Sequence, residues 1–172
     1  MYNNLFTYIR HLELLAFFSG YPLIYYFIRY LAGTKLLKYK WGAIVSILPF
    51  SYALVGSLYI GLQLLNLYPD YSLENLNRHT QLPYLYVWGL SSVLFWIPAL
   101  GKKHIFSLLH SLPFFFILIK VMFFQLRGDT DSHELLKNEM TVYTISIILN
   151  LAAFILVFLS TLQILRKKLP GT

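Results

Sequence analysis

The sequence predicts an all-α integral membrane protein, a helical bundle of about five transmembrane helices. Of its 172 residues, 58% are hydrophobic and only 12% are charged, whereas soluble domains average about 45 to 50% apolar and about 25% charged residues. The apolar residues are also gathered in long runs, and a helix needs about 20 of them to cross a bilayer. Five crossings use most of the chain. We therefore expect a single transmembrane domain over residues 1–172 and no sizeable soluble catalytic domain.

Five apolar runs, each bounded by charges or turn residues, give the expected spans. They cover residues 12–33, 42–67, 83–100, 105–126 and 141–165. The third run begins at Pro83, which suits the first turn of a helix. It is separated from the fourth run only by Gly101, two lysines and His104. This spacing predicts either a tight hairpin of two crossings or a re-entrant pair, and the charged turn favours two crossings.

The connections differ in charge, and this difference orients the bundle. One side gathers nine basic residues and no acid: Arg29, Lys35, Lys38, Lys40, Lys102, Lys103, Arg166, Lys167 and Lys168. The opposite side carries all seven acids. Because basic loops stay on the cytoplasmic side, we expect the N-terminus outside and the C-terminus in the cytoplasm, in a plasma membrane or a bacterial inner membrane. Contact with anionic headgroups explains the net charge of +7, so we expect membrane lipids as partners and no nucleic acid.

Local patterns indicate how the elements begin, pack and bend. Asp131 as a cap with Glu134 three residues later predicts a short surface helix over residues 132–139, before the last span. Small residues recur every four positions on one face of the second span, where another helix should press closely: Ala53, Ser57 and Gly61. We favour a partner within the chain over a neighbouring protomer. Four spans contain prolines that predict kinks and a hollow between helices: Pro22, Pro49, Pro98 and Pro113.

Strong polar side chains inside the spans lie mostly in the expected outer half. A charge at such depth costs a few kcal/mol unless it is paired or reaches the interface, which makes Lys120 the most informative of them. As a functional residue, Lys120 would face the interior and hold an anionic ligand or pair with an acid. Its expected neighbours in such a ligand site are Glu13, Gln63, Asn150, Tyr59 and Tyr143. We favour the alternative, in which Lys120 reaches the interface and the others form structural hydrogen bonds.

The remaining chemistry of the chain is sparse. There is no cysteine, which excludes thiolate ligands and disulfides. Three outer histidines, His11, His79 and His133, are weak candidates for a divalent-metal site, and we favour solvated loop positions for them. We expect His110 to be an interior histidine with satisfied hydrogen bonds. No phosphate loop or nucleophile elbow occurs, so we expect no cofactor and lean against an enzyme.

Three functions remain open from the sequence. The first is an accessory or assembly subunit that packs against a partner membrane protein, with self-association as a variant. The second is a small-ligand transporter, receptor or oligomeric pore with a polar site in the outer half of the bundle. The third is an intramembrane enzyme that modifies a lipid or quinone. The absence of recognisable catalytic machinery places the first ahead of the others.

Overall fold

The structure, a computed structural model, describes residues 12–33, 41–69, 71, 83–127 and 132–168. A helix over residues 12–18 is followed by α2 (Tyr21–Gly33), α3 (Trp41–Leu67), α5 (Pro83–Leu90), the 3-10 helix η2 (Ser91–Trp96), α6 (Pro98–Gly101), α7 (His104–Arg127) and α8 (Ser132–Lys168). The described part of the chain contains no strand. The predicted all-α fold is therefore confirmed.

Four of the expected spans are long and apolar enough to cross a membrane. Within the described residues they are Leu12–Leu31, Ile44–Leu67, His104–Phe124 and Lys137–Ile164. The first of these contains a turn, because the helix stops at residue 18 and resumes at Tyr21. The arrangement is that of a multi-pass helical membrane protein.

The third expected span differs from a regular helix. It consists of α5, η2 and α6, with Ile97 extended between the last two at φ −71° and ψ 122°. The following Pro98 explains the break, because a proline disfavours the helical conformation of the residue before it. An α-helix rises about 1.5 Å per residue and a 3-10 helix about 2.0 Å, so α5 and η2 together extend about 24 Å. The hydrocarbon core of a bilayer is about 30 Å thick, a little more than this length. A fifth crossing stays a prediction.

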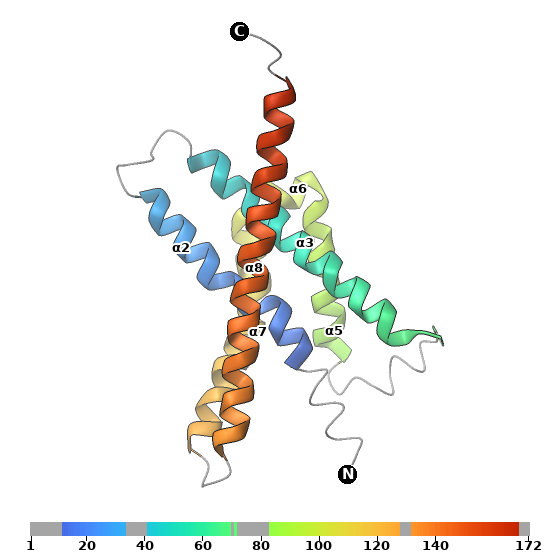
Figure 1. Cartoon of the computed structure of the whole chain (residues 1–172), viewed down its shortest axis with the longest axis vertical. Helices are drawn as coiled ribbons and strands as arrows, with labels where there is room; N and C mark the ends of the chain where they lie inside the picture. Colours follow the sequence, from blue (N-terminus) through green and yellow to red (C-terminus); the bar gives the residue numbers. More distant parts are fainter. Residues whose placement is uncertain (1–11, 34–40, 70, 72–82, 128–131, 169–172) are drawn as a thin grey trace.

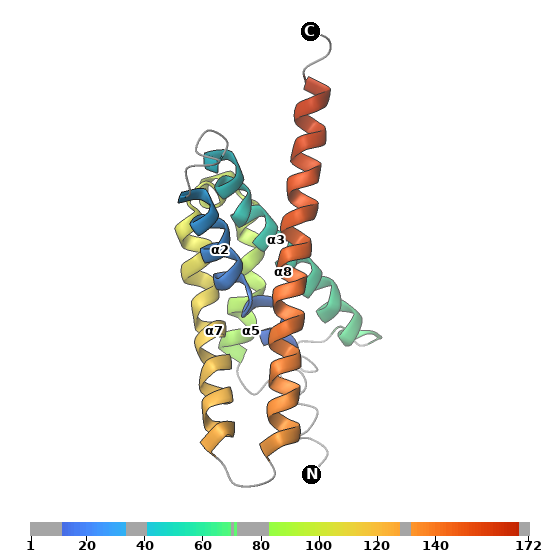
Figure 2. The ribbon, with the colours of Figure 1, turned by 60° about the vertical axis from the view of Figure 1, so that its left-hand side comes forward.

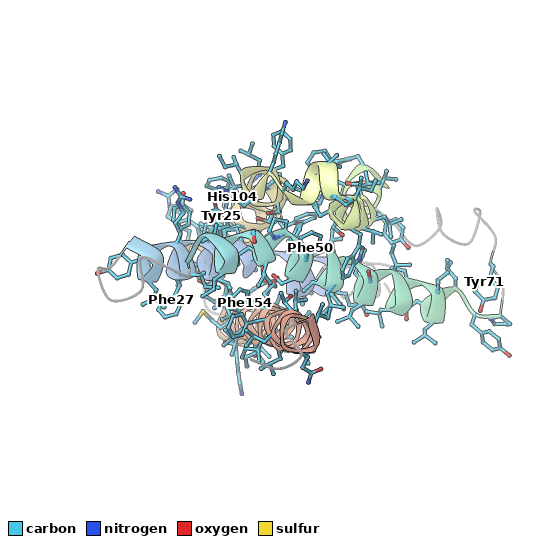
Figure 3. The ribbon with its side chains drawn as sticks, turned by 90° about the horizontal axis from the view of Figure 1, so that it is seen from above. Tyr25, Phe27, Phe50, Tyr71, His104 and Phe154 are labelled. Atoms are coloured by element: carbon cyan, nitrogen blue, oxygen red, sulfur yellow. The ribbon has the colours of Figure 1, made fainter. Side chains whose placement is uncertain are left out.

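The helices lie in three layers. Figure 3 shows α8 end on, on one side of α2 and α3, with α6 and the beginning of α7 on the other side. In Figures 1 and 2, the end of α2, the turn between α6 and α7, and the C-terminal end of α8 point to the same end of the molecule. The helix ends that carry Arg29, Lys102 and Lys103 therefore lie on one side, as expected from the charges. Which side faces the cytoplasm stays a prediction.

The last helix is longer than expected. Residues 132–139 are not a separate surface helix but the beginning of α8, which runs for 37 residues without interruption. No glycine or proline occurs within α8 to stop it. Glu139, which we expected at the end of the surface helix, is buried in the first turns of α8. The apolar pattern predicted the span at residues 141–165, but it did not predict that the helix begins at Ser132.

The prolines act in two different ways. Pro22 and Pro98 lie beside interruptions of the helical chain, whereas Pro49 and Pro113 lie inside the continuous helices α3 and α7. Neighbouring helices and hydroxyls can satisfy the backbone groups that such prolines free. The sequence alone could not distinguish the two cases.

The core is mainly aromatic. Phe18 is stacked on Phe114 with ring centroids 4.9 Å apart, and its edges meet Tyr52 and Tyr59 at 5.6 and 5.3 Å. All four rings are fully buried or nearly so. The core thus joins the first span to α3 and α7, close to the point where the first span is interrupted.

Candidate functional site

The first span is interrupted in the middle of the bundle. The helix over residues 12–18 ends in a turn at Ser19 and Gly20, and α2 begins at Tyr21. Pro22 has no N–H group, so it cannot continue the hydrogen-bond ladder of the first segment. Backbone groups at the break need other partners, because the hydrocarbon core of a bilayer offers no water to bond them.

Two side chains of α8 supply such partners. The Gly20 N–H donates to Ser146 Oγ at 2.6 Å, and Asn150 Nδ2 donates to the Phe17 carbonyl at 2.8 Å. Ser146 and Asn150 are four residues apart and therefore share one face of α8. α8 thus supplies hydrogen-bond partners to the backbone of the first span at its interruption.

Gly20 allows α8 to approach this closely. A Cβ atom at position 20 would lie 2.6 Å from the Ile147 nitrogen and 2.8 Å from the Ser146 carbonyl oxygen. Both atoms belong to the backbone, so neither can move aside as a flexible side chain could. The hydrogen bond from Gly20 to Ser146 therefore depends on the absence of a side chain.

Some buried oxygen atoms at the break lack a donor. Asn150 Oδ1 and Ser19 Oγ have no hydrogen-bond partner within the described part of the chain. Their residues are 2% and 0% exposed. A buried polar atom without a partner reduces the stability of a folded protein by about 1 to 3 kcal/mol. Such atoms therefore indicate that a further hydrogen-bond partner or an ion occupies the site.

We expect Ser146→Ala to destabilise the protein by about 1 to 3 kcal/mol, because the buried Gly20 N–H would lose its acceptor. Thermal unfolding of the purified protein in mild detergent measures the effect. Ser160→Ala is the matched control on the same helix, since Ser160 is exposed and its hydroxyl bonds to the Leu156 carbonyl. Equal stability of the two variants would contradict the role assigned to Ser146.

A second polar cluster surrounds His110, inside α7. His110 Nδ1 lies 2.8 Å from the Tyr52 hydroxyl, and Nε2 lies 2.9 Å from both Ser91 Oγ and the Trp88 carbonyl. The Trp88 ring is stacked on the imidazole, with centroids 4.7 Å apart and 9° between the planes. His110 thus joins α7 to α3 and to the junction of α5 with η2.

The partners of His110 fix its hydrogen-bonding pattern. The Trp88 carbonyl can only accept, and the Ser91 hydroxyl itself donates to that same carbonyl at 2.7 Å. Nε2 therefore carries the proton, and Nδ1 accepts from the Tyr52 hydroxyl. Both ring nitrogens are occupied, which is the arrangement of a structural histidine and not of one free to bind a metal.

Hydrogen bonds of the same kind connect α2 to the beginning of α7. The Tyr25 hydroxyl lies 2.9 Å from His104 Nδ1, and the Tyr21 hydroxyl lies 2.7 Å from Ser107 Oγ. Figure 3 shows Tyr25 and His104 next to each other. These pairs hold α2 against the beginning of α7.

The predicted ligand site is not assembled around Lys120. Lys120 is exposed on α7, and its Nζ lies 5.8 Å from the centroid of the Phe124 ring, one turn nearer the end of the helix. Arg127 ends α7 seven residues later, about 10 Å further along the axis. The side chain therefore lies on the outer surface of the bundle and not in its interior.

The other members of the predicted set lie on three helices: the helix over residues 12–18, α3 and α8. Glu13 accepts a long hydrogen bond of 3.4 Å from Asn66 Nδ2. Tyr59 and Gln63 are buried in α3, and Tyr143 is half-buried in α8. Asn150 bonds to the Phe17 carbonyl at the break, and the Tyr59 ring packs on Phe17 and Phe18 next to it.

Replacing Lys120 with methionine should leave folding unchanged to within about 0.5 kcal/mol, because an exposed side chain away from packed contacts contributes little. Unfolding of Lys120→Met and of the parent protein in the same detergent provides the comparison. A loss of more than about 2 kcal/mol would indicate an interior ion pair.

The small-residue face of α3 is used only in part. Ala53 is fully buried, and Ser57 Oγ accepts a hydrogen bond of 2.9 Å from Trp96 Nε1. Gly61 is exposed, and a Cβ atom there would meet nothing within 4 Å. The closest approach occurs at Gly56, where a Cβ atom would lie 2.9 Å from that of Ser92 in η2. Internal packing therefore involves Gly56 and not Gly61.

The histidines considered for a metal site cannot be placed. His11 and His79 lie outside the described residues, as does the side chain of His133. Among the residues that are described, no group of three or more histidine, aspartate or glutamate side chains could hold a metal ion.

Sequence reasoning missed Ser19, Gly20 and Ser146. The signals were present as a glycine two residues before Pro22 within an apolar run, and as a serine four residues before Asn150. Each occurs often in membrane helices, and their association across 126 residues of sequence appears only in three dimensions.

Fold and polar clusters together define a multi-pass α-helical membrane protein with an interrupted first span. Comparison of the chain with protein-family models, curated proteins and solved structures gave no match.

Proposed function

We propose that the protein is an accessory subunit that packs against a transmembrane helix of a partner membrane protein along the outer face of α8. The observation that carries this proposal is the exposure of α8 in its own bundle. Between residues 140 and 164, only Ser146, Asn150 and Ala153 are buried. The rest of this stretch faces away from the other helices or is half-covered.

The length of α8 supports a partner. Its apolar stretch, Lys137–Ile164, has 28 residues, which extend about 42 Å, against about 30 Å for a hydrocarbon core. In Figure 2 its C-terminal part stands clear of α2, α3 and α7. A helix with such an excess can tilt, kink or locally thicken the bilayer, and a mismatch of this kind also drives some helix–helix association.

The exposed face also has the pattern of a helix-packing seam. Exposed apolar residues alternate at spacings of three and four: Ile145, Ile148, Ala152, Ile155, Leu159 and Leu162. This 3.5-residue repeat is typical of left-handed helix pairs. The seam lies opposite the face that holds Ser146 and Asn150, so a partner could bind without disturbing the bundle.

Cross-linking through single cysteines tests the proposal, because the chain has none of its own. Ile148→Cys and Ile155→Cys place a thiol on the seam. Phe116→Cys on α7 is the matched control, since Phe116 and Ile148 are each 61% exposed. Each variant is treated in its native membranes with a maleimide that carries a photoreactive benzophenone, which inserts into nearby C–H bonds on illumination, and adducts are identified by mass spectrometry.

The proposal requires that both seam variants give an adduct with the same second polypeptide and that the control does not. Ala152→Trp should then reduce co-purification of that polypeptide, whereas Phe116→Trp should not. A seam adduct with a second copy of this chain would replace the partner with self-association. No adduct, or an equal one from the control, would leave lipid as the neighbour of α8 and overturn the proposal.

A second candidate function is a small-ligand transporter or receptor. The specific observation in its favour is the interrupted first span with its buried acceptor atoms, since discontinuous membrane helices often bind ions and solutes. Uptake or binding assays on membranes that contain the protein would test this function directly.

A further inference from the structure

The interruption of the first span leaves main-chain oxygen atoms in the interior. In a continuous helix, the Ala16 carbonyl would accept the Gly20 N–H, and the Phe18 carbonyl would accept that of residue 22. Here Gly20 donates to Ser146 Oγ, and residue 22 is a proline without an N–H group. Both carbonyls therefore lack the N–H donors that a continuous helix would supply, and no other backbone N–H of the described residues replaces them.

The Asn150 amide adds a third oxygen, and its orientation is fixed. Nδ2 donates at 2.8 Å both to the Phe17 carbonyl and to the Ser146 carbonyl. Because a flipped amide would place an oxygen against two other oxygens, Oδ1 must be the atom without a donor. The group that holds α8 to the break thus presents a buried acceptor beside it.

Ser19 contributes a fourth oxygen from within the break itself. It is 0% exposed, and its hydroxyl bonds to none of the described residues. A serine in a membrane helix commonly donates to a carbonyl of its own helix, as Ser51 does to Leu48 at 2.7 Å. Ser19 does not, although the segment before it is helical.

We propose that the break between residue 18 and α2 binds a dehydrated monovalent cation of the alkali series, such as Na⁺. Its ligands would be Asn150 Oδ1, Ser19 Oγ and the carbonyl oxygens freed at the break. Hard cations prefer oxygen ligands, and this set contains no carboxylate, imidazole or thiolate that would favour a divalent or transition metal. The proposal is independent of a partner on α8.

The test is the sodium dependence of thermal unfolding. The purified full chain in mild detergent is heated at several NaCl concentrations, with choline chloride keeping the ionic strength constant, and in KCl and LiCl for selectivity. A cation that binds only the folded state raises Tm progressively with its concentration. We expect Na⁺ or another alkali cation to raise Tm, while choline does not.

Ser19→Ala distinguishes a bound cation from a merely structural site. Because the Ser19 hydroxyl has no partner among the described residues, a purely structural account predicts unchanged or higher stability without sodium. The cation site predicts that the sodium concentration needed for a given rise in Tm increases about tenfold, which corresponds to the loss of about one ligand. Ser51→Ala is the control and should keep the parent response.

The variant Asn150→Ala tests the second side-chain ligand, Asn150 Oδ1. If this variant folds, sodium should no longer raise its Tm. If it does not fold, Ser19→Ala decides the matter alone. Equal Tm values in sodium, potassium, lithium and choline would show that the break holds at most a water molecule and would overturn the proposal. So would a Ser19→Ala protein with the same sodium response as the parent.

Discussion

Gly20→Leu should prevent the first span from packing against α8, and Gly20→Ala should destabilise the protein by about 2 to 3 kcal/mol. The added Cβ would lie 2.6 Å from the Ile147 nitrogen and 2.7 Å from the Ser146 carbonyl carbon. Overpacking of a well-packed interior costs about 1 to 3 kcal/mol even where side chains can adjust, and here the obstacle is backbone. Thermal or denaturant unfolding in detergent measures the loss.

Gly61→Ala provides the matched control for Gly20→Ala. A Cβ atom at position 61 meets nothing within 4 Å, and Gly61 lies inside α3. Alanine is favoured over glycine within a helix by about 1 kcal/mol, so this variant should be neutral or slightly more stable. Similar losses for the two alanine variants would show that Gly20 does not mark a special approach of two helices.

His110→Leu should destabilise the protein by about 2 to 4 kcal/mol. The substitution removes the stack on Trp88 and leaves the Tyr52 and Ser91 hydroxyls without their imidazole partner. Each buried group that loses its partner adds to the cost, beyond the change in packing. Unfolding in detergent, followed by tryptophan fluorescence, reports both stability and the surroundings of Trp88.

Tyr52→Phe separates the hydrogen bond from the packing of His110. It keeps the ring and removes only the hydroxyl, and hydrogen bonds in membrane proteins are worth about 0.6 kcal/mol on average. We expect a loss of about 1 kcal/mol. In the His110→Leu background the same change should cost nothing further, because the hydroxyl has already lost its acceptor. Additive losses would mean that Tyr52 and His110 do not interact.

Much of the architecture could be predicted because length and hydropathy report directly on membrane crossing. The spans expected at residues 12–33, 42–67, 105–126 and 141–165 all contain a long helix segment. The third run could not be resolved, because apolar composition does not distinguish an α-helix from a 3-10 helix.

The candidate site was harder to predict. Asn150 was identified because an amide in an apolar helix needs a partner, but its partner is a main-chain carbonyl, which no sequence pattern reveals. Lys120 seemed the most informative residue because charge in a membrane is costly. Helical periodicity could not place it on the outer face of α7, since that helix is apolar on nearly every side and carries no clear orientation signal.

The bond between Gly20 and Ser146 joins residues 126 positions apart in the chain, and this separation has a consequence for biosynthesis. The first membrane segment leaves the ribosome long before the segment that completes it. During that interval the Gly20 N–H must donate its hydrogen bond to another acceptor: a water molecule among the lipids, a carbonyl of its own helix or an insertion factor. A nascent chain that stops before α8 would carry this defect permanently, and quality-control proteases could recognise it there.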